Sequence, residues 1–323
     1  GRSGAGMGGA GAPDLGGAGG TAGTGGGVTT PPSCGEGLRA CGAEGNSDCC
    51  ESLTVPGGRF DRGNDAAYPA RVHSFRLDTY EVTLARFRRF EAVLAAGYHP
   101  DEGAGQNPNN PDDGGWEASF NEHLPVDRVG FRAELVCDDY STWTNDPGQN
   151  EERPVNCVDW YVSFAFCIWD GGRLPTEAEW NYAAAAGNEQ RIYPWSDPPA
   201  LELIEERHAS YFVDANRECG GDHMNGCTVS DFIRPGSRPD GRGAFGHADL
   251  AGNVYEWVTD RFDPSTPYAN PCNDCANLTN GSNRTMRGGS FINIRALVRT
   301  DFRLEYDPDE SLGGVGMRCA RAL

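Results

Sequence analysis

Apolar side chains recur at helical spacing around residue 87, with polar residues on the opposite face. The stripe comprises Val82, Leu84, Phe87, Phe90, Val93 and Leu94. The residues before it predict a strand, and Gly97 ends the periodic pattern. Residues 71–97 are therefore expected to form a strand that runs into a helix.

Two more helices are predicted further along the chain. The apolar segment 161–172, YVSFAFCIWDGG, predicts the first. The second follows Pro175, where Thr176 and Glu179 have the spacing of a capping box, and it ends at Gly187 after a run of alanines.

The segments between these helices are rich in Gly, Asn, Asp and Pro, namely residues 100–130, 188–248 and 262–286. Short strands are predicted at 285–291 and 315–321. Long irregular segments are unusual in a large domain and need cross-links or ions to hold them. We therefore predict an α+β fold with low helix and strand content.

The N-terminal part differs from the rest. Residues 1–33 are nearly all small or polar, which predicts a flexible Gly/Ala-rich tether. Residues 34–52 form a small cysteine-rich cap, and the globular domain covers residues 53–323. The neighbours Cys49 and Cys50 are poorly placed to bond to each other, so they pair with Cys34 and Cys41 in an order left open.

Twelve cysteines predict a disulfide framework formed in an oxidising compartment. We expect an exported, extracellular or cell-surface bacterial protein, with a signal peptide and a possible lipid-anchored cysteine upstream of residue 1. A zinc site would need paired Cys-x-x-Cys motifs, and Cys272 and Cys275 form a single such pair. For that pair a loop-closing disulfide is favoured over a redox couple or half of a metal site.

The net charge of −20, with arginine as the sole basic residue, argues against nucleic acids and anionic membranes as partners. No apolar stretch approaches the length of about 20 residues that a membrane-spanning helix needs. We therefore expect no transmembrane segment.

The order of several motifs resembles the formylglycine-generating enzyme (sulfatase-modifying factor) family over residues 53–323. These motifs are PVNCVDWYVSFAFCIWDGGRLPTEAEWNYAAAAG, YPWS, GHADLAGNVYEWVTD, RGGSF and GVGMRCAR. The resemblance implies an irregular fold related to C-type lectins. It also implies a disulfide between Cys167 and Cys319, while proximity in the sequence suggests Cys137–Cys157, Cys219–Cys227 and Cys272–Cys275.

The resemblance further implies a structural calcium ion in the GNVYEW loop. Its ligands would be the carboxylates of Asp249 and Glu256 and the carbonyl groups of Gly252 and Val254, which are oxygen ligands of the kind that calcium prefers. The alternative is that the two carboxylates merely cap the turn or face water.

Two positions depart from the family pattern. Enzymes of this family hold copper(I) between two thiolates, and the matching positions here are Asn293 and Val298. Because copper(I) needs soft sulfur ligands, we expect no copper and no formylglycine-generating activity.

Two functions remain after this departure. The first is a non-catalytic module, secreted or tethered to the cell surface, that binds a peptide, glycan or protein on its variable loops. The second is an enzyme with altered, non-copper chemistry in a pocket around Ser290, Asn293, Arg295 and Arg299, whose arginines would favour an anionic ligand.

Overall fold

The computed structural model describes residues 1, 30–35, 38–213, 218–222, 224, 226–266 and 268–323. The chain divides into two units, Gly1–Thr30 and Pro31–Leu323. The predicted tether falls almost wholly outside the described residues. Its last residues, 31–33, belong to the second unit, where Ser33 is fully buried.

Four α-helices lie in the described residues: α1 (Leu84–Leu94), α2 (Arg128–Glu134), α3 (Trp160–Trp169) and α4 (Glu177–Ala184). Each begins after a polar cap whose side chain accepts hydrogen bonds from the first turn. The capping box predicted for α4 is present, because Thr176 and Glu179 each accept from the other's backbone N–H. Short 3-10 helices occur at Arg62–Asn64, Ala118–His123, Gly187–Glu189, Val229–Asp231, Pro239–Gly241 and Arg295–Leu297.

The strands are short and form five small sheets, ordered β12-β11-β9-β13, β10-β5-β4, β14-β6-β3, β1-β2 and β7-β8. Their bounds are β1 (Arg39–Cys41), β2 (Ser47–Asp48), β3 (Ser52–Val55), β4 (Gly58–Asp61), β5 (Pro69–Val72), β6 (Phe75–Asp78), β7 (Phe212–Val213), β8 (Glu218–Cys219), β9 (Tyr255–Arg261), β10 (Cys272–Asn273), β11 (Arg284–Arg287), β12 (Arg303–Tyr306), β13 (Val315–Gly316) and β14 (Ala320–Arg321). The α+β class with low helix and strand content is confirmed.

Two strand predictions were too long. The strand predicted at 285–291 is β11, which ends at Arg287 because Gly288 and Gly289 have φ angles of 94° and 72°. Positive φ angles are incompatible with an extended strand. The strand predicted at 315–321 is divided between two sheets, since β13 pairs with β9 whereas β14 pairs with β6.

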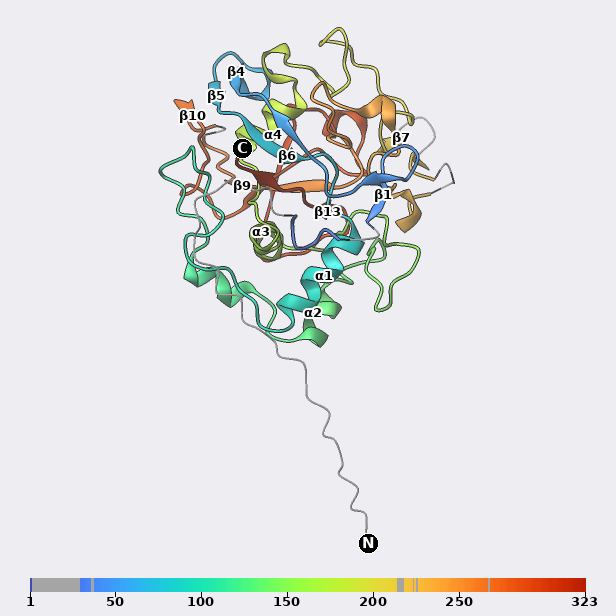
Figure 1. The fold of residues 1–323 in the computed structure, drawn as a ribbon. Helices are drawn as coiled ribbons and strands as arrows, with labels where there is room; N and C mark the ends of the chain where they lie inside the picture. The colour runs from blue at the N-terminus through green and yellow to red at the C-terminus, as the bar shows by residue number, and fades with distance from the viewer. Residues whose placement is uncertain (2–29, 36–37, 214–217, 223, 225, 267) are drawn as a thin grey trace. The chain divides into compact units, whose positions relative to one another are not determined.

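The main core lies where α3 packs against β9. Trp160 of α3 donates its indole N–H to the Val258 carbonyl oxygen, and Trp257 of β9 donates to the Val158 carbonyl oxygen, both at 2.9 Å. Helices α1, α2 and α3 gather on one side of β9 and β13, and α4 lies on the other (Figure 1). Within the described residues, no helix has the length and apolar character needed to cross a bilayer.

All twelve cysteines form disulfides, so the predicted disulfide framework is confirmed. The pairs are Cys34–Cys50, Cys41–Cys49, Cys137–Cys157, Cys167–Cys319, Cys219–Cys227 and Cys272–Cys275. The order left open for the cap is thus nested, with Cys41–Cys49 inside Cys34–Cys50. Cys167–Cys319 joins α3 to the residue before β14.

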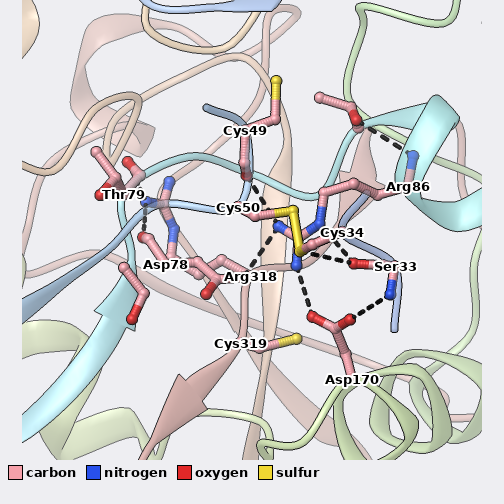
Figure 2. A network of polar contacts seen from close by, with 12 residues as sticks. Ser33, Cys34, Cys49, Cys50, Asp78, Thr79, Arg86, Asp170, Arg318 and Cys319 are labelled. Carbon is pink, nitrogen blue, oxygen red and sulfur yellow. Dashed lines mark hydrogen bonds and ion pairs between the residues drawn. A yellow bond between two sulfur atoms is a disulfide. The ribbon is translucent and has the colours of Figure 1, made fainter. Parts of the chain in front are cut away.

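A buried ionic network joins the N-terminal segment to the helices (Figure 2). Arg86 of α1 donates to Asp78 Oδ2 at 3.1 Å, to Asp170 Oδ2 at 2.7 Å and to the hydroxyl of Ser33 at 3.0 Å. Arg321 of β14 bonds to the same two aspartates. We call these five residues the Arg86 network. Arg86 Nη1 also donates to the Cys49 carbonyl oxygen at 3.1 Å, so the cap and the larger domain are parts of one folded unit.

Candidate functional site

The loop predicted to bind calcium precedes β9 and has an unusual backbone. Asp249, Gly252 and Asn253 have φ angles of 55°, 82° and 63°. A Cβ at Gly252 would lie 2.1 Å from the Ser210 carbonyl oxygen, so glycine is required there. The Asp249 carboxylate is buried and accepts a hydrogen bond from the Gly236 N–H at 2.5 Å.

Glu256, the second predicted carboxylate ligand, has a different main partner. Its two carboxylate oxygens accept from Arg318 at 2.6 and 2.7 Å, and Trp180 Nε1 donates to it at 2.7 Å. Both Glu256 and Arg318 are fully buried. A cation at Glu256 would therefore share this carboxylate with a guanidinium group.

Glu81 is a buried carboxylate near this loop that the sequence did not single out. It accepts from Asn253 Nδ2 at 2.5 Å and from the Val254 N–H at 3.3 Å. Burial raises the pKa of Glu81 well above its usual range, and the carboxylates of Asp249 and Glu256 raise it further. Burial likewise raises the pKa of Asp249 to about 6.

These residues form a buried cluster with more acids than bases, which we call the Glu81 cluster: Glu81, Asp249, Glu256 and Arg318. Three carboxylates face one guanidinium group, and burying such a charge excess is costly unless a cation compensates it. Among the described residues, no group donates a hydrogen bond to the Gly252 or Val254 carbonyl oxygens. Carbonyl oxygens together with carboxylates are calcium ligands, so the donor set fits the ion.

The carboxylates of the Glu81 cluster are too far apart to hold an ion by themselves. Over the described residues, three metal-ligating side chains converge within 4.8 Å in one group, formed by Cys137, Asp138 and Cys157. Its two sulfurs are bonded to each other, so it has no free thiolate to offer a metal. The three acids of the Glu81 cluster do not converge to that distance, so an ion there would depend on carbonyl ligands as well.

The two positions that match the family's copper ligands, Asn293 and Val298, have different surroundings. Asn293 Oδ1 accepts from the Ser290 backbone N–H at 2.8 Å and from the Ser290 hydroxyl at 2.7 Å. Val298 is fully buried in an apolar cluster with Tyr193, Ala209 and other residues. The structure thus brings Ser290 and Asn293 together and places Val298 in the core.

The two arginines of the predicted pocket have different surroundings. Arg299 forms hydrogen bonds at 3.0 Å with both carboxylate oxygens of Asp301, and it reaches Glu202 at 3.2 Å. Its charge is therefore largely neutralised. Arg295 is exposed and forms no ion pair with any described residue. Of the two, Arg295 remains the candidate anion ligand.

Three loops meet around Asn293, and we call their exposed surface the Asn293 face. Phe212 of β7 donates its N–H to the Asn293 carbonyl oxygen, and Tyr193 donates its hydroxyl to the Arg295 carbonyl oxygen. Three large apolar side chains on these loops are exposed, namely Leu201 (38%), Leu203 (39%) and Ile292 (42%). Sequence reasoning missed them because the exposure of an apolar side chain depends on the fold.

Comparisons with known proteins agree with this fold. A family model for the sulfatase-modifying factor enzyme 1-like domain matches residues 40–323, beginning inside the predicted cap. The chain is 31% identical over 303 residues to the formylglycine-generating enzyme of Streptomyces coelicolor, covering 83% of this chain and 88% of the relative. It is 28% identical over 309 residues to the inactive C-alpha-formylglycine-generating enzyme 2 of Bos taurus, covering 85% and 89%.

A solved structure, PvdO from Pseudomonas aeruginosa, matches with a TM-score of 0.56 and 20% sequence identity, covering 92% of this chain and all of that one. At this identity the likeness shows the fold alone. The irregular architecture expected from the motifs is therefore confirmed.

Proposed function

Because the chain belongs to the sulfatase-modifying factor enzyme 1-like family, yet carries Asn293 and Val298 where the resemblance implies copper ligands, we propose that it is an exported, non-catalytic binding module. Its ligand would be a peptide, glycan or protein, held on the Asn293 face. The disulfide framework supports export, since such frameworks form in oxidising compartments.

One observation carries the non-catalytic assignment. All twelve cysteines are in disulfides, so no thiolate is available to bind copper(I) anywhere in the oxidised protein. At the two family positions, Asn293 is occupied by its bonds to Ser290 and Val298 is in the core. The existence of an inactive relative in the same family agrees with a non-catalytic member.

The exposed side chains of the Asn293 face favour a peptide or protein ligand. Large apolar side chains exposed on adjoining loops are typical of interaction sites, and Arg295 adds a positive charge that has no ion-pair partner among the described residues of a strongly acidic protein. The Trp195 ring nearby is stacked with Tyr193 and His208, at centroid distances of 5.2 and 5.0 Å. It therefore offers less free ring surface to a sugar than an isolated tryptophan would.

We further propose that calcium binds the Glu81 cluster as a structural ion. The Asp249 carboxylate and the Gly252 and Val254 carbonyl groups would hold it, and the charge of Glu81 would favour it. The alternative function, an enzyme with non-copper chemistry, is less favoured because Arg299 is bound to Asp301 and Glu202.

Metal analysis and oxygen uptake test the non-catalytic assignment. Protein purified in its oxidised form should hold no copper(I) above background and should consume no oxygen in the presence of a cysteine-containing peptide and copper. A formylglycine-generating enzyme assayed in parallel is the positive control. Stoichiometric copper together with oxygen consumption would contradict the proposal.

A random peptide library displayed on phage tests the binding face. The wild-type protein should enrich peptides that the variants Leu203→Asp and Ile292→Asp no longer retain. Val129→Asp, at an 81% exposed apolar side chain of α2, is the matched control and should retain them. Equal loss in all three variants, or equal retention, would show that the ligand binds elsewhere.

A further inference from the structure

The Cys272–Cys275 disulfide lies beside a buried cation. Arg62 is 3% exposed, and its Nη1 donates to Cys275 Sγ at 3.3 Å. The guanidinium group also bonds to the Ala269 carbonyl oxygen and lies 4.8 Å from the centre of the Tyr268 ring. Arg62 thus contacts one sulfur of the disulfide and the loop that leads to it.

Arg62 has no anionic contact partner among the residues that the structure describes. No carboxylate there forms an ion pair with it, and its Nε has no hydrogen-bond partner. Burial lowers the pKa of Arg62, and the carboxylates of Asp260 and Glu177 offset this only from a greater distance. Buried charges are normally paired. A thiolate on Cys275 would supply the missing anion in direct contact.

The two cysteine residues differ in solvent exposure. Cys275 is partly exposed, whereas Cys272 is 6% exposed and its strand β10 pairs with β5. The carboxylate of Asp274, which lies between them in the sequence, is bonded to the backbone N–H of His73 at 2.6 Å and to its ring at 2.5 Å. An accessible cysteine beside a protected resolving cysteine is the arrangement of a redox-active pair.

This disulfide also constrains the chain least. Its sequence separation is 3, whereas the other five pairs are separated by 8 to 152 residues. In the chain-entropy model, the stabilisation by a disulfide grows with the length of the loop that it closes. Opening Cys272–Cys275 therefore costs the fold less than opening any other pair.

From these contacts we propose that Cys272 and Cys275 form a redox couple that exchanges with an external dithiol, small or protein-borne, and that Arg62 holds the Cys275 thiolate. In reduction, a thiolate of the dithiol attacks Cys275 Sγ and forms a mixed disulfide, while Cys272 leaves as a thiolate and takes up a proton. The second thiol of the dithiol then loses its proton to solvent and attacks the dithiol sulfur that is bonded to Cys275 in the mixed disulfide. The Cys275 thiolate is released to Arg62, and two electrons have passed from the dithiol, now a disulfide, to the cysteine pair.

Graded reduction of the full chain tests the couple. The folded protein is equilibrated with increasing dithiothreitol, free thiols are alkylated, and the modified cysteines are identified by peptide mass spectrometry. Cys272 and Cys275 should be alkylated at a reductant concentration at least about tenfold lower than Cys219 and Cys227, the next shortest loop with a partly exposed sulfur. Reduction of both pairs together, or of Cys219–Cys227 first, would overturn the proposal.

The role of Arg62 is tested on a free Cys275. In Cys272→Ser, the rate of iodoacetamide alkylation against pH should give a Cys275 pKa below the ordinary value of about 8.5. Adding Arg62→Met should raise that pKa by about one unit or more, which is a loss of about tenfold in thiolate at pH 7. Adding Arg59→Met, on exposed β4, is the matched control and should leave it unchanged.

A Cys275 pKa at or above 8.5 in Cys272→Ser alone would overturn the role of Arg62, even if the Arg62 variant fails to fold. The same holds if Arg62→Met and Arg59→Met give identical profiles in folded protein. Circular dichroism and the integrity of the other five disulfides report folding in each variant.

Discussion

The Arg86 network and the Glu81 cluster are both buried, but their charges balance differently. In the Arg86 network two arginines bond to two aspartates, and each charged group has a partner of opposite sign. In the Glu81 cluster three carboxylates share Arg318, which bonds to Glu256 alone among them. The first is complete as it stands, whereas the second is the kind of environment that a bound cation would complete.

The pKa shifts of the buried groups also differ between the two regions. Burial alone would lower the pKa of Arg86. The carboxylates of Asp78 and Asp170 outweigh this effect, so the pKa is raised. In the Glu81 cluster, burial raises the pKa values of Glu81 and Asp249, which favours their neutral forms. The comparison teaches that burial alone does not distinguish the two regions, whereas the balance of their buried charges does.

The largest expected effect comes from removing Arg86. Arg86→Met leaves Asp78 and Asp170 with Arg321 alone in a buried setting, and breaking such a pair costs about 3–5 kcal/mol. The free energy of unfolding from urea denaturation measures it. Arg89→Met, a partly exposed position on the same helix, should cost less than about 1 kcal/mol. Equal losses in the two variants would show that the network contributes little.

The second test is the pH dependence of the calcium-free protein. The pKa of Asp249 is about 6 in the folded state and about 3.9 when unfolded, so its contribution is present below pH 4 and is lost as the pH rises through 6. Between pH 4 and 7 the stability should fall by up to about 3 kcal/mol from this group. Burial also raises the pKa of Asp260 to about 7, that of Asp159 to about 8 and that of Glu81 well above its usual range, and all three act in the same direction.

Asp249→Asn isolates the contribution of Asp249. The variant keeps the part of the pH dependence due to Asp260 and Asp159, and it loses the part due to Asp249 together with the share of the Glu81 shift that the Asp249 charge causes. The free energy of unfolding is measured by urea denaturation at pH 4, 5, 6 and 7. If it falls with pH by the same amount in the wild type and in this variant, the Asp249 carboxylate does not contribute to the pH dependence.

The third test adds calcium. Calcium at 100 times its dissociation constant should stabilise the protein by about 2.7 kcal/mol. This gain should grow from pH 5 to pH 7.5, because the ion needs ionised carboxylates. Thermal unfolding with calcium or with a chelator measures it. Glu81→Gln should weaken the gain. A melting temperature at pH 7.5 that does not depend on calcium would contradict the proposal that the Glu81 cluster, unlike the Arg86 network, binds a cation.

The smallest effect is expected at Asn293, the position that matches a copper ligand of the family, which belongs to neither region. Asn293→Ala removes two hydrogen bonds to Ser290 and should cost about 1–2 kcal/mol in unfolding free energy. Asn280→Ala, on an exposed loop, is the control and should cost less than about 0.5 kcal/mol. A loss at Asn293 as large as that at Arg86 would mean that this turn supports much more of the fold than its contacts suggest.

Helices with sequence signals inside one turn could be predicted, whereas the candidate site depends mostly on contacts between residues far apart in the sequence. The capping box at Thr176 specified α4 because its atoms all lie within one turn. Helix α2 was missed because its seven residues include a glycine and bury Phe131 alone. Glu81 could not be identified from sequence, since Asn253 and Val254, which bond to it, lie more than 170 residues away. Arg299 is neutralised mainly by Asp301, two residues away, and only its further contact with Glu202 spans 97 residues.

The bridge between Cys167 and Cys319 orders the events of maturation. Cys319 is synthesised 152 residues after Cys167, so the helix at the centre of the core leaves the ribosome with its thiol unpaired. Cys137 and Cys157 are already present by then and must bond to each other rather than to Cys167. If disulfides form while the chain is being made, this thiol has to stay reduced, or be reshuffled, until the segment just before β14 that carries Cys319 arrives.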